Sequence, residues 1–249
     1  MIELTGVSKA FDGHSVLRGL DLTVAAGETV VILGRSGTGK SVTLKHIVGL
    51  IPPDEGSIRV DGREVVGANR QALRTIRKQV AYLFQNGALV NWMSVRDNVA
   101  LPLVEHAELP PAEISQRVDE TLEKLDMLSA AARYPGEISG GMRKRAALCR
   151  VLVAEPRAIL YDEPTAGLDP IMARIVAGLI ERVGAEHPER SAVVVTHDLE
   201  LAFAVADRIG LHHDGRITVI DTPDRFRDSD HPVIRAFLDG RTTPEETRP

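Results

Sequence analysis

The stretch GRSGTGKS, from Gly34 to Ser41, constrains the fold of this chain more than any other feature of its sequence. It follows the apolar run ETVVIL and matches the pattern G-x-x-x-x-G-K-[ST] at every fixed position. Glycines let main-chain N–H groups turn toward phosphate oxygens, and the helix that follows adds the positive end of its dipole. Lys40 offers a positive charge, and Ser41 offers a hydroxyl to Mg²⁺. The pattern predicts a strand, a phosphate-binding loop and a helix, with a glycine-rich turn that binds nothing as the alternative.

Composition and charge exclude several classes of protein. The 249 residues, 43% hydrophobic and 26% charged, are enough for one large domain or two unequal ones. No apolar run approaches the roughly 18 to 20 residues of a membrane span, and the first residues lack the features of a signal peptide, so we expect a cytoplasmic protein. The single cysteine, Cys149, excludes an internal disulfide framework. The net charge of -5 gives no overall attraction to nucleic acid, and we expect no nucleic acid partner.

Hydrophobic periodicity divides the chain into three regions. Short β-type runs fill the first third (IELTGV, LDLTV, ETVVIL and SIRVDGREV), with a two-residue hairpin turn at Asp61-Gly62, and they predict a small antiparallel layer. From about Pro110 to Glu155 apolar residues recur three and four apart, which predicts a helical insertion. The strands AILY and AVVVT then flank a helical segment. This alternation predicts an α/β fold with a parallel sheet covered by helices on both faces.

Polar residues end two of these strands. AILY leads into Asp162 and Glu163, and AVVVT leads into His197. The carboxyl edge of such a sheet is where ligands bind. There Asp162 can hold the shell of a Mg²⁺ ion, Glu163 can polarise a water for attack on a γ-phosphate, and His197 can sense that phosphate through a hydrogen bond. The alternatives are a solvated acidic strand end and a structural histidine.

A second anion site is predicted at ISGGM, residues 138–142. Ser139, Gly140 and Gly141 precede a helix and expose free N–H groups there. A single bound nucleotide does not need a second phosphate-binding site about 100 residues after the one at Gly34–Ser41.

The ordered series of motifs resembles the ATPase subunits of ABC transporters over residues 1–240. GRSGTGKS is similar to Walker A, Gln85 to the Q-loop glutamine, ISGGM to the signature motif, AILYDEP to Walker B, AGLD at 166–169 to the D-loop, and His197 to the switch histidine. The resemblance implies a P-loop NTPase fold of the ABC type in a single nucleotide-binding domain. That domain has a mixed sheet core, an antiparallel β-subdomain and an inserted helical subdomain at about 86–155, and residues 241–249 form a tail.

The resemblance also implies ATP and Mg²⁺ as cofactors and ATP hydrolysis as the reaction. Phe11 falls where the family stacks an aromatic ring on adenine, although a phenylalanine in a β-layer is as often a core residue. The catalytic residues implied are Glu163, His197 and Lys40, and the metal-binding residues are Ser41, Gln85 and Asp162. The nucleotide-binding residues implied are Phe11, Gly34, Arg35, Ser36, Gly37, Thr38, Gly39, Lys40, Ser41, Val42, Gln85, Ser139, Gly140, Gly141 and Asp169.

A head-to-tail homodimer is implied, in which ISGGM of each chain closes over the ATP held by the other. Met142 departs from the glutamine that usually ends the signature, but the contacts from Ser139 and the main-chain N–H groups do not depend on it. Arg143, Lys144 and Arg145 follow. They form either a solvated helix face or a cluster of cations near the γ-phosphate of the partner's ATP.

Four longer segments resemble a narrower branch, the ATPases of Mla and Mce systems. These are YPGEISGGMRKRAALCRVL, NGALVNWMSVRDNVALPL, GRSGTGKSV and VIRAFLDGR. This likeness implies phospholipid or lipid transport across the bacterial envelope and a peripheral position on the cytoplasmic face of the inner membrane. The implied partners are an integral membrane permease (MlaE-like), an MCE-domain substrate-binding protein and a small STAS-domain subunit.

Two questions stay open at the level of sequence. The apolar segment 87–104 either fills the core of the helical subdomain or forms a groove for a cytoplasmic helix of a membrane subunit. The alternatives for function are an ABC ATPase for another solute and a soluble ABC regulator of DNA repair or translation. A single cassette and an acidic balance disfavour the regulator.

Overall fold

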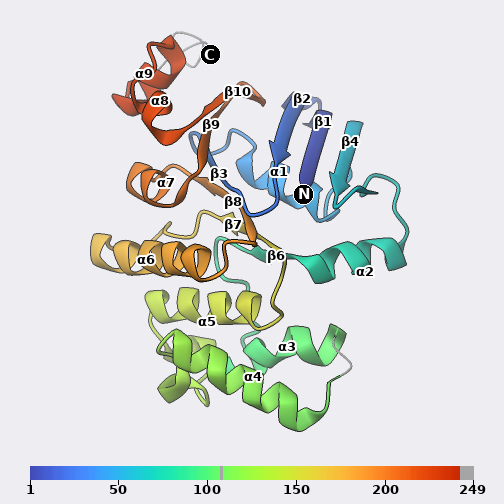
Figure 1. Ribbon diagram of the computed structural model, residues 1–249, viewed down its shortest axis with the longest axis vertical. Coiled ribbons are helices and arrows are strands. Elements are labelled where there is room, and N and C mark those ends of the chain that lie inside the picture. Colours follow the sequence, from blue (N-terminus) through green and yellow to red (C-terminus); the bar gives the residue numbers. More distant parts are fainter. Residues whose placement is uncertain (107–108, 242–249) are drawn as a thin grey trace.

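A mixed sheet forms the centre of the protein (Figure 1). The computed structural model describes residues 1–106 and 109–241. The strand order is β10-β9-β3-β8-β7-β6, and β10 alone of these strands runs antiparallel to its neighbour. The strands are β3 (Thr29–Leu33), β6 (Val80–Leu83), β7 (Ala158–Asp162), β8 (Ser191–Thr196), β9 (Arg208–His213) and β10 (Arg216–Asp221). Because parallel strands end at one edge, the residues that follow β3, β7 and β8 lie close together.

A smaller antiparallel sheet packs beside the central one, with the strand order β2-β1-β4-β5. Its strands are β1 (Ile2–Phe11), β2 (His14–Val24), β4 (Glu55–Val60) and β5 (Arg63–Glu64). In β1, Ile2 and Leu4 are buried and Glu3 and Thr5 are exposed, as expected for a sheet with one face on the core. The Asp61-Gly62 turn joins β4 to β5 with φ of +47° and +73°. Positive φ at both positions is typical of a two-residue hairpin, so that prediction is confirmed.

The run ETVVIL was predicted to lie in the antiparallel layer, and this prediction is wrong. The run forms β3, which lies between β8 and β9 in the central sheet. Val31 and Leu33 enter one hydrophobic core, whereas Val30 and Ile32 enter the other. A strand that is covered on both faces needs apolar residues at successive positions, which ETVVIL has and the alternating β1 lacks.

Helices cover both faces of the central sheet and confirm the predicted α/β class. One core lies between this sheet, the antiparallel sheet and α1, and the other lies between the sheet and the helices from α3 onward. The helices are α1 (Lys40–Ile47), α2 (Arg70–Gln79), α3 (Val95–His106), α4 (Pro111–Lys124), α5 (Gly140–Leu152), α6 (Pro170–Glu186), α7 (Leu199–Val205), α8 (Pro223–Arg227) and α9 (Pro232–Leu238), with 3-10 turns η1 (Leu128–Ala130) and η2 (Pro135–Glu137).

Helices α3, α4 and α5 pack together beside the central sheet (Figure 1). This helical region begins at Val95, earlier than the predicted start near Pro110, because α3 precedes the periodic segment. The subdomain limits at about 86 and 155 stay a prediction. Of the predicted tail, 241–249, all but Arg241 lies outside the described residues. Within the described ranges, no helix has the length and apolar character that crossing a membrane requires.

Replacing Phe226 by alanine should destabilise the protein strongly. The Phe226 side chain on α8 is fully buried in the larger core, and emptying such a site costs about 3–5 kcal/mol. Val104→Ala is the control, because Val104 is 62% exposed, and it should change stability by less than about 0.5 kcal/mol. Urea unfolding at equal m-value measures both. Equal midpoints for the two variants would contradict this account of the core.

Candidate active site

The phosphate-binding loop connects β3 to α1 and depends on two of its glycines. Gly39 precedes α1 with φ of +107°, and no side chain caps the helix there. A Cβ on Gly39 would lie 2.8 Å from Val16 Cγ1, and one on Gly34 would lie 2.8 Å from the carbonyl oxygen of His212. A larger residue would therefore displace main chain at Gly34, and at Gly39 it would displace the Val16 side chain and strain the left-handed main chain. The loop has the geometry of an anion site at a helix start.

Lys40 places its charge inside this loop. Its ammonium donates hydrogen bonds to the carbonyl oxygens of Gly34 (2.7 Å) and Arg35 (2.8 Å). It also lies 3.2 Å from Glu163 Oε1, and the residue is only 5% exposed. The cation thus connects the loop after β3 with the acidic end of β7, as the strand-end rule predicts.

Asp162, at the end of β7, accepts hydrogen bonds on both carboxylate oxygens. Ser41 Oγ donates to Oδ1 (2.6 Å), and Tyr82 Oη donates to Oδ2 (2.8 Å). A hydroxyl beside a buried carboxylate is an oxygen donor set that suits Mg²⁺, which keeps several of its waters. Burial, followed by the charge of Asp162, raises the pKa of Tyr82, so the phenol stays a donor.

Tyr82 was not predicted to belong to the site, although the sequence contains a signal for it. Tyr82 lies on β6, which pairs in parallel with β7, and it is opposite Leu160 in the register. The same strand-end reasoning that groups Asp162 with His197 would have placed a polar residue near the end of β6 at this edge.

Glu163 is fixed by contacts on both carboxylate oxygens. Lys40 approaches Oε1, and His197 Nδ1 lies 2.9 Å from Oε2. The Glu163 main chain has φ of +45°, a left-handed conformation that is unfavourable for a residue with a Cβ. Its N–H donates to the carbonyl of Val195 (2.9 Å) on the neighbouring strand β8. The structure therefore brings together all three residues predicted to be catalytic.

Lys144 lies in this site, and the solvated helix face predicted as one of its two locations is wrong. Its ammonium, on the second turn of α5, donates to the carbonyl oxygens of Gln85 and Glu163, the latter at 3.3 Å. The residue is 7% exposed, so it is not on a solvated face, and its position relative to a partner's ATP stays a prediction. Burial lowers the pKa of Lys144, and the charges of Asp162 and Glu163 act against that shift.

The neighbours of Lys144, Arg143 and Arg145, bond to main-chain carbonyls close to α5. Arg143 Nη1 donates to the carbonyl of Ile138 (3.2 Å), and Arg145 Nη1 donates to that of Leu125 (3.4 Å). Arg143 is exposed and Arg145 is half-buried.

The ISGGM and AGLD motifs each begin a helix, and the two helices touch. Ser139 caps α5 by accepting from Met142 N–H (3.3 Å), and Asp169 caps α6 by accepting from two N–H groups (3.0 Å each). A Cβ on Gly141 would meet the end of the Met172 side chain on α6, which would have to move to make room for it. The predicted contacts of Ser139, Gly140, Gly141 and Asp169 with nucleotide stay predictions.

The remaining predicted residues surround the loop or lie at its margins. Ser36 and Gly37 are exposed, Thr38 Oγ1 donates to the Arg35 carbonyl (3.0 Å), and Val42 packs against the smaller core. Phe11 ends β1 with 40% of its surface exposed and Lys9 Nζ 5.4 Å from its ring centre, so it is not a core residue. Its stacking on adenine stays a prediction, as does metal binding by the exposed Gln85 side chain.

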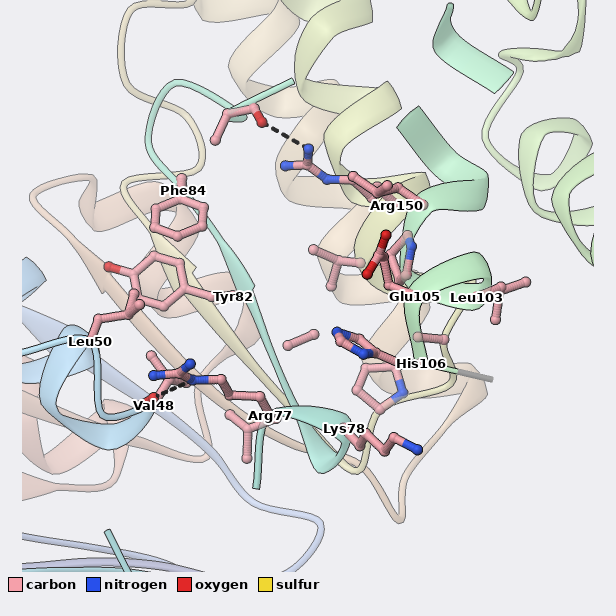
Figure 2. Close-up of a pocket in the computed structure, with 18 of the residues that line it drawn as sticks. Val48, Leu50, Arg77, Lys78, Tyr82, Phe84, Leu103, Glu105, His106 and Arg150 are labelled. Carbon is pink, nitrogen blue, oxygen red and sulfur yellow. Dashed lines mark hydrogen bonds between the residues drawn. The ribbon is translucent and has the colours of Figure 1, made fainter. Parts of the chain in front are cut away.

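A cavity of about 710 Å³ opens beside the site (Figure 2). It lies between the end of α1, α2, β6, α3 and α5, and Tyr82 and Phe84 form part of its wall. Its lining is mostly apolar but includes Arg77, Lys78 and Arg150. The guanidinium of Arg77 donates to the Val48 and Gly49 carbonyls, and that of Arg150 to the Gly87 and Ala88 carbonyls.

The segment 87–104 contributes to the core of the helical region, as one of its two predicted alternatives requires, while its role as a groove for a membrane subunit stays a prediction. Val95 and Val99 are fully buried in the larger core. Val90 and Leu101 line the cavity, and Leu103 both lines the cavity and belongs to the larger core. Trp92 does neither, because 83% of it is exposed.

Comparison with known proteins identifies relatives over nearly the whole chain. The family model described as ABC transporter matches residues 17–166. The probable ribonucleotide transport ATP-binding protein mkl of Mycobacterium tuberculosis is 40% identical over 96% of this chain and 67% of its own length. The intermembrane phospholipid transport system ATP-binding protein MlaF of Escherichia coli K12 is 37% identical over 96% of this chain and 89% of its own.

Two further proteins extend the comparison. The chloroplastic protein TRIGALACTOSYLDIACYLGLYCEROL 3 of Arabidopsis thaliana is 35% identical over 96% of this chain and 74% of its own length. Among solved structures, the ATP-binding cassette MJ0796, a dimer in a post-hydrolysis state with ADP and phosphate, superposes with a TM-score of 0.82. It is 29% identical and covers 90% of this chain and 99% of its own.

Replacing Gly39 by alanine should weaken ATP binding at least about tenfold, because the residue needs a left-handed main chain and its Cβ would meet Val16. Gly178→Ala is the matched control, since a Cβ there meets open space within α6 and alanine favours the helix. Titration with a fluorescent ATP analogue measures both affinities. Equal affinities in the two variants would show that the loop geometry does not determine binding.

Proposed function

This chain belongs to the ABC transporter family of ATPases, and from that we propose that it powers phospholipid transport across the bacterial envelope as the ATP-hydrolysing subunit of an Mla-type system. The observation that carries the proposal is the convergence of Lys40, Asp162, Glu163 and His197 at one sheet edge. The chain aligns with most of MlaF, whose name states phospholipid transport, and with a plant protein whose name states a glycerolipid.

Each residue of the site has a role that its position supports. The loop N–H groups and Lys40 bind the phosphates of ATP. Glu163 accepts a hydrogen bond from the attacking water and takes its proton. The water oxygen bonds to the γ-phosphorus while the bond from this phosphorus to the bridging oxygen breaks, and ADP leaves. His197 orients Glu163 from the side opposite Lys40. Ser41 and Asp162 would hold Mg²⁺, which neutralises charge on the phosphates when bound.

Two copies of the chain complete two sites. The first turn of α5 presents N–H groups that its own loop does not need, and a dimeric relative of the same fold has been observed after hydrolysis. A head-to-tail dimer lets Ser139 and the glycines of each chain cover the nucleotide of the other.

The cavity beside β6 receives a cytoplasmic helix of the MlaE-like integral membrane permease. The lining is apolar, and Arg77, Lys78 and Arg150 give it an excess of positive charge over Glu105. Among the described residues, neither guanidinium there forms an ion pair, since both bond to carbonyls. The occupant is therefore an apolar helix with at least one carboxylate. An MCE-domain protein and a STAS-domain subunit complete the complex, at the cytoplasmic face of the inner membrane.

Glu163→Gln should retain ATP binding and lose at least about 100-fold in turnover, because the amide cannot accept the proton of the attacking water. Dimers should accumulate with Mg-ATP, since hydrolysis no longer releases them. Glu186→Gln, at the exposed end of α6, is the control and should hydrolyse normally. Phosphate release and size-exclusion chromatography measure the two effects. Normal turnover of Glu163→Gln would exclude this carboxylate as the base.

Lys78→Glu should reduce the amount of permease that co-purifies with the chain about tenfold or more, because it reverses an exposed charge at the cavity. The loss should be greatest at low salt, where screening is weakest. Arg63→Glu makes the same charge change on the exposed strand β5, outside the cavity lining, and should leave the yield of complex unchanged. Equal yields for the two variants would exclude the cavity as the permease site.

A further inference from the structure

Lys144 connects two loops of the active site through their main chains. Its ammonium donates to the carbonyl oxygen of Gln85, two residues after the end of β6, and to that of Glu163, directly after β7. Burying a lysine costs free energy unless its N–H donors are hydrogen-bonded. The two acceptors of Lys144 are main-chain carbonyl oxygens that no other predicted site residue contacts. The cation is therefore placed to hold main chain rather than substrate.

The left-handed main chain of Glu163 depends on surrounding contacts more than any other part of the site described above. Its left-handed conformation persists only where surrounding contacts fix it. The N–H is fixed by Val195 on β8, and the carbonyl oxygen accepts from the N–H of Ala166 (3.1 Å) and from Lys144. A change at the carbonyl would rotate the residue and move its carboxylate relative to Lys40 and His197.

Helix α5 connects this contact to the signature motif. Ser139 caps the first turn, and Lys144 follows five positions later, about 7.5 Å along the helix axis. The following residues Ala146, Ala147 and Cys149 are fully buried, so the helix is packed firmly against the core. A displacement of its first turn is therefore carried to Lys144.

We propose that Lys144 is a positioning residue that sets the carboxylate of Glu163 according to the state of α5, so that nucleotide bound by the partner chain at the first turn of α5 prepares this chain's own site for hydrolysis. The proposal rests on the head-to-tail dimer of the proposed function. It assigns to one side chain the coupling between the two nucleotide sites, because Lys144 contacts the hydrolytic loop and belongs to the helix that covers the partner's ATP.

The test is the steady-state ATPase activity of Lys144→Met in the complex with its permease, with Mg-ATP affinity measured separately. Methionine keeps the length and packing of the side chain but cannot donate. We expect kcat to fall about 10- to 100-fold, as for a small misplacement of a reacting group, with ATP affinity changed less than about twofold. Lys144→Arg retains charged donors and should recover most of kcat.

Arg145→Met is the matched control, since Arg145 is the next residue of α5 and bonds to Leu125 outside the site. It should keep the wild-type kcat. A kcat of Lys144→Met within twofold of wild type would overturn the proposal, as would a failure of Lys144→Arg to recover activity while its thermal unfolding matches wild type. An equal loss of kcat and ATP affinity would also overturn it, because it would indicate damage to binding.

Glu163→Gln in the same assay distinguishes a failure of the role assigned to Lys144 from a failure of the proposed ATPase function. If Glu163→Gln is inactive and Lys144→Met is normal, the inference fails and the proposed function stands. If wild type shows no ATPase activity in the complex, the proposed function itself fails.

Discussion

The buried ion pair between Lys40 and Glu163 is the interaction on which the arrangement of the site depends. Their side chains are 4% and 10% exposed, and burying two charges is favourable only when their other hydrogen-bonding positions are also occupied. Two loop carbonyls accept hydrogen bonds from the Lys40 ammonium, and His197 bonds to the second carboxylate oxygen of Glu163. These contacts connect the ends of β3, β7 and β8, which the parallel pairing brings together, around the place where the phosphates are expected to bind.

Much of this framework could be predicted because it follows from strand ends. Once ETVVIL, AILY and AVVVT are taken as parallel neighbours, Lys40, Asp162, Glu163 and His197 must share one edge. The membership of β3 in the central sheet was missed, because its four successive buried residues were not distinguished from the alternation of β1. Apolar residues at successive positions were the available signal that a strand is buried on both faces.

Lys144 could not be predicted in the same way. It lies in the middle of a helix and reaches Gln85, 59 positions earlier, and Glu163, 19 positions later. Both contacts depend on how α5 packs against the sheet, and no periodicity encodes that packing. In sequence the lysine is one of three consecutive basic residues, and only the fold separates the buried cation from the exposed Arg143.

One side chain, Tyr82, connects the cavity to Asp162, the carboxylate predicted to bind Mg²⁺. The ring of Tyr82 forms part of the cavity wall and stacks on Phe84 with 4.2 Å between ring centres, while its hydroxyl donates to Asp162. A helix seated in the cavity therefore contacts the ring that orients this carboxylate. Gln85 lies two residues after the end of this strand, and its carbonyl oxygen accepts a hydrogen bond from Lys144 of α5. In the proposed complex, the region around the end of β6 would therefore be contacted from two directions, from the cavity through Tyr82 and from the dimer interface through Lys144. These two side chains bond to Asp162, which ends β7, and to the carbonyl oxygen of Glu163, which follows it.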